Sequence, residues 1–294
     1  MKSVLVICNP FAGGSTSTKV LNDYKVFSEK QDQAQFHFYL TSGPEDYKGI
    51  DSAVNQYNPD VVSIVGGDGT INEILNVRSV RARKIHLVPA GSGNDFHRLV
   101  YGNISCEQSF EFALATSEQP YDIGTCNQRY FLNGVGIGFD GSVARQTVRM
   151  KLPFLSSTWK YWIAIFRNIL FYKSVEMTIR VTGKEVTKPI FMIAVANGTD
   201  YGGGFKVSPK SNATDGLLDV VEIGKLHPLK RLLKVPKVEK GKHLNEPFVK
   251  HYTVKRIEIQ SLSLLYAHLD GELMEAHHFT IEIQSPVRFV VQAR

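Results

Sequence analysis

The sequence predicts two units of different architecture, an α/β unit followed by a mainly β unit. In about the first 125 of the 294 residues, short apolar runs alternate with longer mixed segments, whereas β-branched runs dominate from about residue 130 onward. The length is close to twice that of a usual single domain, so two cores are expected. With 43% hydrophobic and 21% charged residues, the composition excludes long disorder and a disulfide scaffold.

The first unit is predicted from its apolar runs, each of which ends in Gly, Pro, Asn or Ser. The expected strands are residues 3–8, 36–40, 61–65 and 85–88, and the expected helices are residues 18–30, 45–57, 70–77 and 105–116. This alternation is typical of a parallel sheet covered by helices. In such a sheet a ligand binds at the carboxyl ends of the strands.

The second unit is predicted to be mainly antiparallel β structure. Its expected strands are residues 177–182, 190–196, 218–223, 254–260, 262–269, 279–283 and 287–291. The exception is residues 151–173, where aromatic and aliphatic residues recur at mixed helical spacing without a single acidic residue.

Several classes of protein are excluded by what the chain lacks. The three cysteines form no CxxC pair and the histidines stand at no zinc-ligand spacing, so neither a disulfide framework nor a zinc site is expected. The longest nearly apolar run, residues 161–172, is too short to cross a bilayer. No cleavable signal precedes the first strand, which favours a cytoplasmic location. The net charge of +6 suits an anionic partner, but no motif for nucleic acid accompanies it.

Three glycine-containing turns each follow an expected strand. They are residues 9–15 (Asn-Pro-Phe-Ala-Gly-Gly-Ser), residues 66–73 (Gly-Gly-Asp-Gly-Thr-Ile-Asn-Glu) and residues 89–96 (Pro-Ala-Gly-Ser-Gly-Asn-Asp-Phe). Glycine lets the backbone approach an anion closely, and the N–H groups at the start of a following helix attract phosphate. Because parallel strands end at one edge, the three turns are expected to converge on a nucleotide. None of them is a Walker A loop, because no Gly-Lys-Ser/Thr follows.

These three turns resemble the nucleotide site of the diacylglycerol kinase catalytic-domain family, which includes bacterial soluble lipid kinases and sphingosine kinases. Gly-Gly-Asp-Gly-Thr alone would also suit NAD kinases, but Gly-Ser-Gly-Asn-Asp-Phe distinguishes this family. The resemblance continues through residues 121–124, 133–140, 197–198, 202–209, 215–219 and 270–272. It implies an α/β nucleotide domain similar to that of NAD kinase and phosphofructokinase, a C-terminal β-sandwich domain, a cleft between them, and Mg·ATP-dependent phosphorylation of a lipid hydroxyl. We place the domains at residues 1–124 and 125–286, with a strand at about 287–294 that returns to the first.

The resemblance also implies roles for individual residues. The ATP contacts would come from Asn9, Pro10, Phe11, Ala12, Gly13, Thr41, Gly66, Gly67, Asp68, Gly69, Thr70, Ile71, Asn72, Ser92 and Asn94. Asp270 and Glu272 would flank the reacting hydroxyl, and one of them would accept its proton. We favour Glu272 and leave Asp270 open. Phosphoryl transfer needs such a carboxylate to align the attacking hydroxyl.

Two magnesium sites are implied in the same way. Asp215, with the backbone carbonyls of Asn212 and Leu217, resembles a structural magnesium site, although Thr214 replaces an Asp that many relatives carry. Asp68, Asp95 and Asp122, with Arg98 nearby, are candidates for a network around a catalytic magnesium ion. For Asp122 a purely structural role is an equal alternative, and the first turn lacks the Lys that relatives often place shortly after its Gly.

Two other functions remain as alternatives: an NAD kinase-like enzyme, and a catalytically silent lipid- or nucleotide-binding protein. The acceptor lipid is left open among a diacylglycerol-like lipid, a sphingoid base, a phosphatidylglycerol-like lipid and a polyprenol. A homodimer is left open as well. All charges between Asp140 and Glu176 are basic, and aromatic residues are interleaved with them. Residues 145–173 are therefore expected to contact the inner membrane face, helped by the basic residues 225–242, with a helix packed on the β unit as the alternative.

Overall fold

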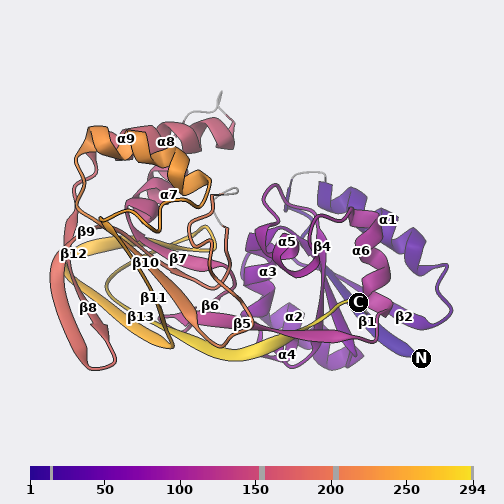
Figure 1. Cartoon of the computed structure of the whole chain (residues 1–294). Helices are drawn as coiled ribbons and strands as arrows, with labels where there is room; N and C mark the ends of the chain where they lie inside the picture. Colours follow the sequence, from indigo (N-terminus) through magenta and orange to yellow (C-terminus); the bar gives the residue numbers. More distant parts are fainter. Residues whose placement is uncertain (14–15, 152–155, 201–204, 293–294) are drawn as a thin grey trace. The chain divides into compact units, whose positions relative to one another are not determined.

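The computed structural model describes residues 1–13, 16–151, 156–200 and 205–292 (Figure 1). Residues 14–15, 152–155, 202–204 and 293–294 of the segments discussed above therefore lie outside the described residues. The chain divides into two compact units, Met1–Tyr121 with Ser285–Arg294, and Asp122–Gln284. The division falls at residues 121 and 284, where the sequence suggested 124 and 286.

The first unit contains a helix-covered sheet. Its elements are β1 Lys2–Cys8, α1 Thr16–Ser28, β2 Ala34–Leu40, α2 Tyr47–Tyr57, β3 Val61–Gly66, α3 Asp68–Leu75, α4 Arg78–Arg81, β4 Lys84–Pro89, α5 Asp95–Tyr101, α6 Cys106–Phe110 and the 3₁₀ helix Glu111–Leu114. The pairings β2–β1, β1–β3 and β3–β4 are all parallel. Strands predicted in this part of the chain are present, and the helix predicted at residues 105–116 is α6 continued by the 3₁₀ turn.

Burial on both faces explains why these strands are continuous apolar runs. Val4 and Val6 of β1 pack with Val20 and Tyr24 of α1 in one core cluster. Because side chains alternate along a strand, Leu5 of β1 points to the opposite face, and it too is fully buried. Helices on both faces leave the strand ends as the open edge of the sheet.

The described residues of the second unit form antiparallel strands and three helices. Its elements are β6 Arg129–Phe131, β7 Gly134–Gly138, α7 Phe139–Arg149, α8 Ser157–Phe171, β8 Val175–Val181, β9 Lys184–Ala196, β10 Leu218–Gly224, α9 Pro228–Glu239, β11 Val249–Val254 and β12 Arg256–Leu269. The strands β5 Glu118–Cys126 and β13 Glu272–Val290 each have residues in both units. The pairing order is β11-β10-β9-β7-β12-β13, and β8 pairs with β9 and β12. Most pairings along the whole path are antiparallel.

The structure corrects two strand predictions in this unit and shows one helix that was not predicted, α9. Residues 254–260 and 262–269 are not two strands: most of both ranges belongs to β12, whose register shifts between Gln260 and Leu265. The expected strands 279–283 and 287–291 likewise belong mostly to the single long strand β13. Helix α9, which contains Pro236, was not predicted because a proline inside a helix removes a backbone donor.

Alternation along β9 divides the interior of the second unit in two. Ile193 and Val195 belong to a core cluster among the strands, whereas Met192 and Ala194 belong to a second cluster on the other face. Helices α7, α8 and α9 lie over that second face (Figure 1). No helix among the described residues is long and apolar enough to cross a membrane.

The start of α6 offers a test of local stability. Ser105 Oγ accepts the N–H of Gln108 at 3.2 Å, and Gln108 Oε1 accepts the N–H of Ser105 at 2.8 Å. We expect Ser105→Ala to lower the free energy of unfolding by about 1 kcal/mol, measured by urea denaturation. The control Ser52→Ala, at an exposed site within α2, should leave stability unchanged or slightly raised; equal losses in both variants would contradict the capping role.

Candidate functional site

Two glycine turns of the first unit touch through their main chains. A Cβ on Gly91 would lie 2.5 Å from the Cα of Gly67, and a Cβ on Gly66 would lie 2.5 Å from the Cβ of Thr70. Only glycine therefore fits at these positions without displacing the backbone. Gly67 stands directly before α3, so the first N–H groups of that helix lack partners within the helix.

Asp68 fastens the second turn to the first. Its Oδ2 accepts the N–H of Asp95 and its Oδ1 accepts the N–H of Phe96, both at 3.0 Å, at the start of α5. Asn94, in the left-handed conformation, closes the second turn by exchanging two hydrogen bonds with Gly91. The side chains of Asp68 and Asn94 thus shape the loops, and the loops present main chain to a ligand.

The turn after β1 lies against the turn at residues 89–96. Gly13 has φ of +61°, and a Cβ there would lie 2.3 Å from the carbonyl oxygen of Ala90. Asn9 Oδ1 accepts the N–H of Phe11, and the carbonyl of Ala12 accepts the hydroxyl of Ser17. The three turns thus converge in the structure.

Thr41 contributes a polar atom that the described chain does not use. Its N–H donates to the carbonyl of Cys8 at 3.0 Å, which holds the residue beside the end of β1. The side chain is buried, yet within the described residues Oγ1 has no hydrogen-bond partner. A buried hydroxyl without a partner is costly, so this atom is a candidate ligand contact.

The remaining predicted nucleotide contacts differ in exposure. Thr70, Ile71 and Asn72 are buried in α3, whereas Gly69, Ser92 and Phe11 are exposed. Burial of Ile71 and Asn72 leaves them a supporting role beneath the loop.

The second unit holds the two candidate catalytic carboxylates on one hairpin, but in different environments. Asp270 and Gly271, both at positive φ, form the turn between β12 and β13. Asp270 accepts the N–H groups of Leu132, Asn133 and Gly134 at 2.7 to 3.0 Å. Three such bonds fix the carboxylate to the main chain. Glu272, two residues on, is exposed, so it is the one of the two that is accessible to an acceptor.

Behind this turn lies a pair that the sequence did not predict. His268 Nε2 is 2.9 Å from Asp140 Oδ2, and both side chains are largely buried. Gly136 leaves room for them, since a Cβ there would lie 2.3 Å from the Asp140 oxygen. The N–H of Gly271 also points at His268 Nδ1, 3.3 Å away. The histidine therefore links the hairpin turn to α7.

Opposing effects set the pKa of His268. Burial lowers it, but the charges of Asp140 and Asp270 and the contact with Asp140 outweigh burial, so the pKa lies above its usual value. The sequence gives no signal for this pair, because Asp140 and His268 lie far apart along the chain and no motif contains both.

The residues of the two expected magnesium sites are engaged with one another. Asp215 Oδ1 accepts the N–H of Leu217 at 3.0 Å, and Asn212 Oδ1 accepts the hydroxyl of Thr214 at 2.8 Å. Asp122 Oδ2 accepts the N–H of Gly216 at 2.7 Å. Burial raises the pKa of Asp122. The hydrogen bond from Gly216 lowers it and the nearby charge of Asp215 raises it, and the net pKa lies above its usual value. The structural reading of Asp122 is thereby favoured.

The candidate catalytic magnesium ligands are engaged as well. Both oxygens of Asp68 accept main-chain N–H groups, and Asp95 pairs with Arg98. Within residues 1–13, 16–151, 156–200 and 205–292, no group of three His, Cys, Asp or Glu residues is placed to hold a metal ion. The described residues therefore contain no preformed cluster of side-chain ligands for a catalytic magnesium ion.

An apolar cavity of about 100 Å³ lies in the second unit, between the helices and the sheet. Helices α7, α8 and α9 contribute Val143, Ile165, Ile169 and Val235, and the sheet contributes Phe191, with other lining residues of similar kind. The polar lining includes Asp140, Arg231 and Lys234.

Each charge at this cavity is already engaged. Asp140 meets His268, and Lys234 pairs with Glu246. Arg231 donates to the carbonyls of Ile169 and Tyr172 at 3.0 and 2.7 Å. The cavity therefore suits a neutral apolar ligand better than a charged one.

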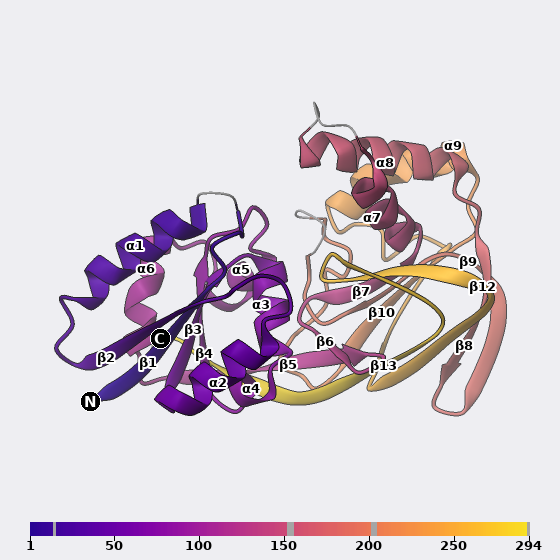
Figure 2. The same cartoon turned by 180° about the vertical axis from the view of Figure 1, so that it is seen from behind.

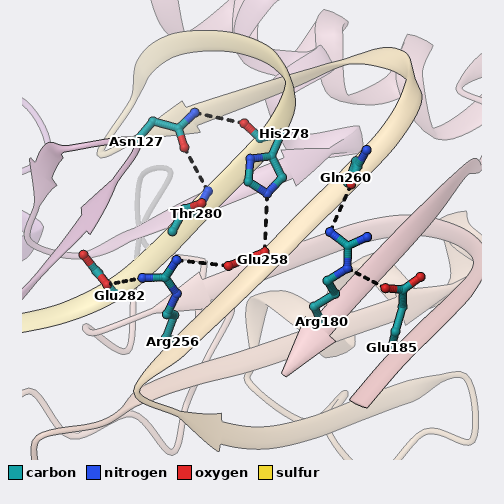
Figure 3. A network of polar contacts seen from close by, with 9 residues as sticks. All are labelled: Asn127, Arg180, Glu185, Arg256, Glu258, Gln260, His278, Thr280 and Glu282. Atoms are coloured by element: carbon teal, nitrogen blue, oxygen red, sulfur yellow. Dashed lines mark hydrogen bonds and ion pairs between the residues drawn. The ribbon is translucent and has the colours of Figure 1, made fainter. Parts of the chain in front are cut away.

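A separate polar network on β8, β9, β12 and β13 carries no candidate site (Figure 3). Arg256 pairs with Glu258 and Glu282 at 3.0 Å, and Arg180 pairs with Glu185. These ion pairs lie at the surface, where solvent screens each of them.

Comparisons with known proteins agree with this geometry. The family model of the diacylglycerol kinase catalytic domain matches residues 3–126, and that of the YegS C-terminal NAD kinase beta sandwich-like domain matches residues 133–290. The chain belongs to the diacylglycerol kinase catalytic-domain family of lipid kinases, which confirms the family inferred from its motifs.

Individual relatives span most of the chain. It is 25% identical over 280 residues to a diacylglycerol kinase of Bacillus subtilis, covering 92% of this chain and 90% of that protein. It is 28% identical over 213 residues to a protein of Chromohalobacter salexigens named "Probable lipid kinase YegS-like", covering 70% and 68%. Among solved structures, a diacylglycerol kinase from Bacillus anthracis has a TM-score of 0.70 at 18% identity, covering 99% of this chain and 97% of that one. That similarity concerns the fold.

The pair formed by His268 and Asp140 predicts a pH-dependent stability. Because the folded-state pKa of His268 is raised above its unfolded value, its charge stabilises the fold fully below about pH 6.5. That contribution is lost as the pH rises through the folded-state pKa. We expect His268→Gln to lower the free energy of unfolding by about 1 to 3 kcal/mol at pH 5.5, and by less at pH 8.5. Urea denaturation at both pH values measures this, and equal losses would contradict a charged histidine.

Proposed function

We propose that the protein transfers the γ-phosphate of ATP to the hydroxyl group of a neutral, diacylglycerol-like lipid. The observation that carries the proposal is the main-chain contact between the turns at Gly67 and Gly91, joined by the turn at Gly13. It supports a platform of backbone N–H groups at helix starts, which suits a polyphosphate. The family relationship supports the same chemistry.

The platform and its surroundings give ATP two kinds of contact. The amides at the start of α3 face phosphate oxygens, and the unused hydroxyl of Thr41 offers a hydrogen bond elsewhere on the nucleotide. With no preformed metal cluster among the described residues, we propose that any magnesium ion arrives on the phosphates of ATP and neutralises their charge.

The acceptor side of the proposal rests on the second unit. The cavity beneath α7, α8 and α9 has an apolar lining, and its volume of about 100 Å³ suits a short part of an acyl chain. Because the charge of Asp140 is balanced by His268, nothing there favours the ammonium group of a sphingoid base over a neutral headgroup. This supports a diacylglycerol-like acceptor.

Glu272 is proposed as the base. Its carboxylate accepts the proton of the lipid hydroxyl while the hydroxyl oxygen forms a bond to the γ-phosphorus, and the bond to the β,γ-bridging oxygen breaks to release ADP. Asp270 holds the turn that presents Glu272, through its three main-chain hydrogen bonds.

The alternative functions are less well supported. An NAD kinase-like enzyme would phosphorylate a polar, charged dinucleotide, which does not suit a cavity with so apolar a lining. A silent binding protein would have no need of an exposed Glu272 beside a rigidly fastened turn.

The base is tested by Glu272→Gln. We expect kcat for phosphorylation of diacylglycerol with radiolabelled ATP to fall about 10²-fold or more, because a positioned base contributes about 10² to 10⁴. Stability should not change, since the side chain is exposed. The control is Glu275→Gln, an exposed carboxylate on the same strand, which should keep its activity. Full activity of the Glu272 variant would remove this residue from the mechanism.

Thr41→Val tests the nucleotide contact. Valine keeps the shape of threonine and removes the hydroxyl, so the KM for ATP should rise about five- to tenfold, the equivalent of one hydrogen bond of about 1 kcal/mol. Stability without nucleotide should be unchanged or higher, because a buried polar atom without a partner is removed. An unchanged KM together with lower stability would show that the hydroxyl serves the fold.

A further inference from the structure

Helix α8 shows its apolar side chains to the solvent. Its exposed large residues are Trp159, Trp162, Ile163, Phe166, Leu170 and Phe171, of which Phe171 is 73% and Trp159 is 64% exposed. The buried stripe, which includes Ala164, Ile165 and Ile169, already packs on the unit. The helix is therefore apolar on both faces, although only one face contributes to the core.

Helix α9 shows the same pattern beside it. Leu229 and Leu233, one turn apart, are 64% and 76% exposed. Both views show α8 and α9 side by side (Figures 1 and 2). Arg231 of α9 fixes this arrangement by donating to the carbonyls of Ile169 and Tyr172 at the end of α8. The exposed residues of both helices form what we call the α8–α9 surface.

Basic residues accompany this surface. Helix α8 carries Lys160 and Arg167 and no acidic residue, and α9 carries four basic residues against the single acidic Glu239. Glu246 pairs with Lys234 and Lys237, which leaves an excess of positive charge. Apolar and aromatic side chains among cations complement the acyl chains and anionic headgroups of a lipid surface.

We propose that the α8–α9 surface docks on an anionic phospholipid membrane. Large exposed apolar patches on a protein mark a partner, and the charge identifies its kind. A second copy of the chain fits less well, because a symmetric dimer through this surface would set its cations against one another. Docking does not depend on the proposed kinase reaction, although the same two helices wall the cavity that we assign to the lipid.

The chain carries its own probe for this proposal. Its only two tryptophans, Trp159 and Trp162, both belong to the α8–α9 surface. We expect their emission to shift to the blue when phosphatidylcholine vesicles with about one third phosphatidylglycerol are added, and less with phosphatidylcholine alone, since each cation near an anionic surface favours binding. Lipids brominated on their acyl chains should quench that emission.

The double variant Phe166→Ser, Leu233→Ser tests the surface. Neither residue lines the cavity. We expect at least a tenfold loss of vesicle affinity in sedimentation, with unchanged thermal stability. The matched control is Leu262→Ser, on β12, because Leu262 is 100% exposed and lies outside the α8–α9 surface. This control should bind vesicles as the unmodified protein does.

Three results would overturn the proposal. The first is a tryptophan emission that neither kind of vesicle changes. The second is equal vesicle binding by the double variant and the unmodified protein. The third is an unmodified protein that sediments as a dimer while the double variant sediments as a monomer. Activity on a water-soluble short-chain diacylglycerol should be the same in all three proteins. If the unmodified protein showed no such activity, that result would count against the proposed kinase reaction and not against docking.

Discussion

The close approach of two main chains, at Gly67 and Gly91, is the constraint on which the proposed nucleotide platform depends. It brings the turns after two neighbouring parallel strands within van der Waals contact. Asp68 stabilises this approach, because both of its carboxylate oxygens accept hydrogen bonds from the amides at the start of α5. The start of α5 attracts the negative charge of Asp68 through its free N–H groups. The same helix start follows the turn that would face a phosphate.

The hairpin between β12 and β13 holds two neighbouring carboxylates in different environments. Asp270 is fastened to three main-chain amides, while Glu272 projects into solvent. A residue that must accept a proton needs access and a fixed position, and one side chain rarely has both. In the proposed mechanism Asp270 would supply the fixed position and Glu272 the access.

Much of the arrangement of the three turns could be predicted from the sequence, because its signals are local. A strand, a glycine pair and a helix start stand together in residues 61–75, and the parallel pairing of β3 with β4 brings the next such turn alongside. The pair His268 and Asp140 could not be predicted, because it depends on how α7 packs against β12. The full length of β12 was also missed, since its irregular stretch from Gln260 to Leu265 reads as a break between two strands.

The guanidinium of Arg231 and the imidazole of His268 both tie a helix of the second unit to its neighbours, yet they respond differently to acidity. Burial lowers the pKa of Arg231, but from so high a value that the guanidinium keeps its charge, and its partners are peptide carbonyls that do not titrate. The contact of α8 with α9 is therefore the same in acid and in base. Protonation of His268, in contrast, strengthens its contact with Asp140 of α7 but turns Nδ1 into a donor, so that Nδ1 no longer accepts the N–H of Gly271. A change of pH would therefore act on the turn that carries Glu272 and leave the two outer helices as they are.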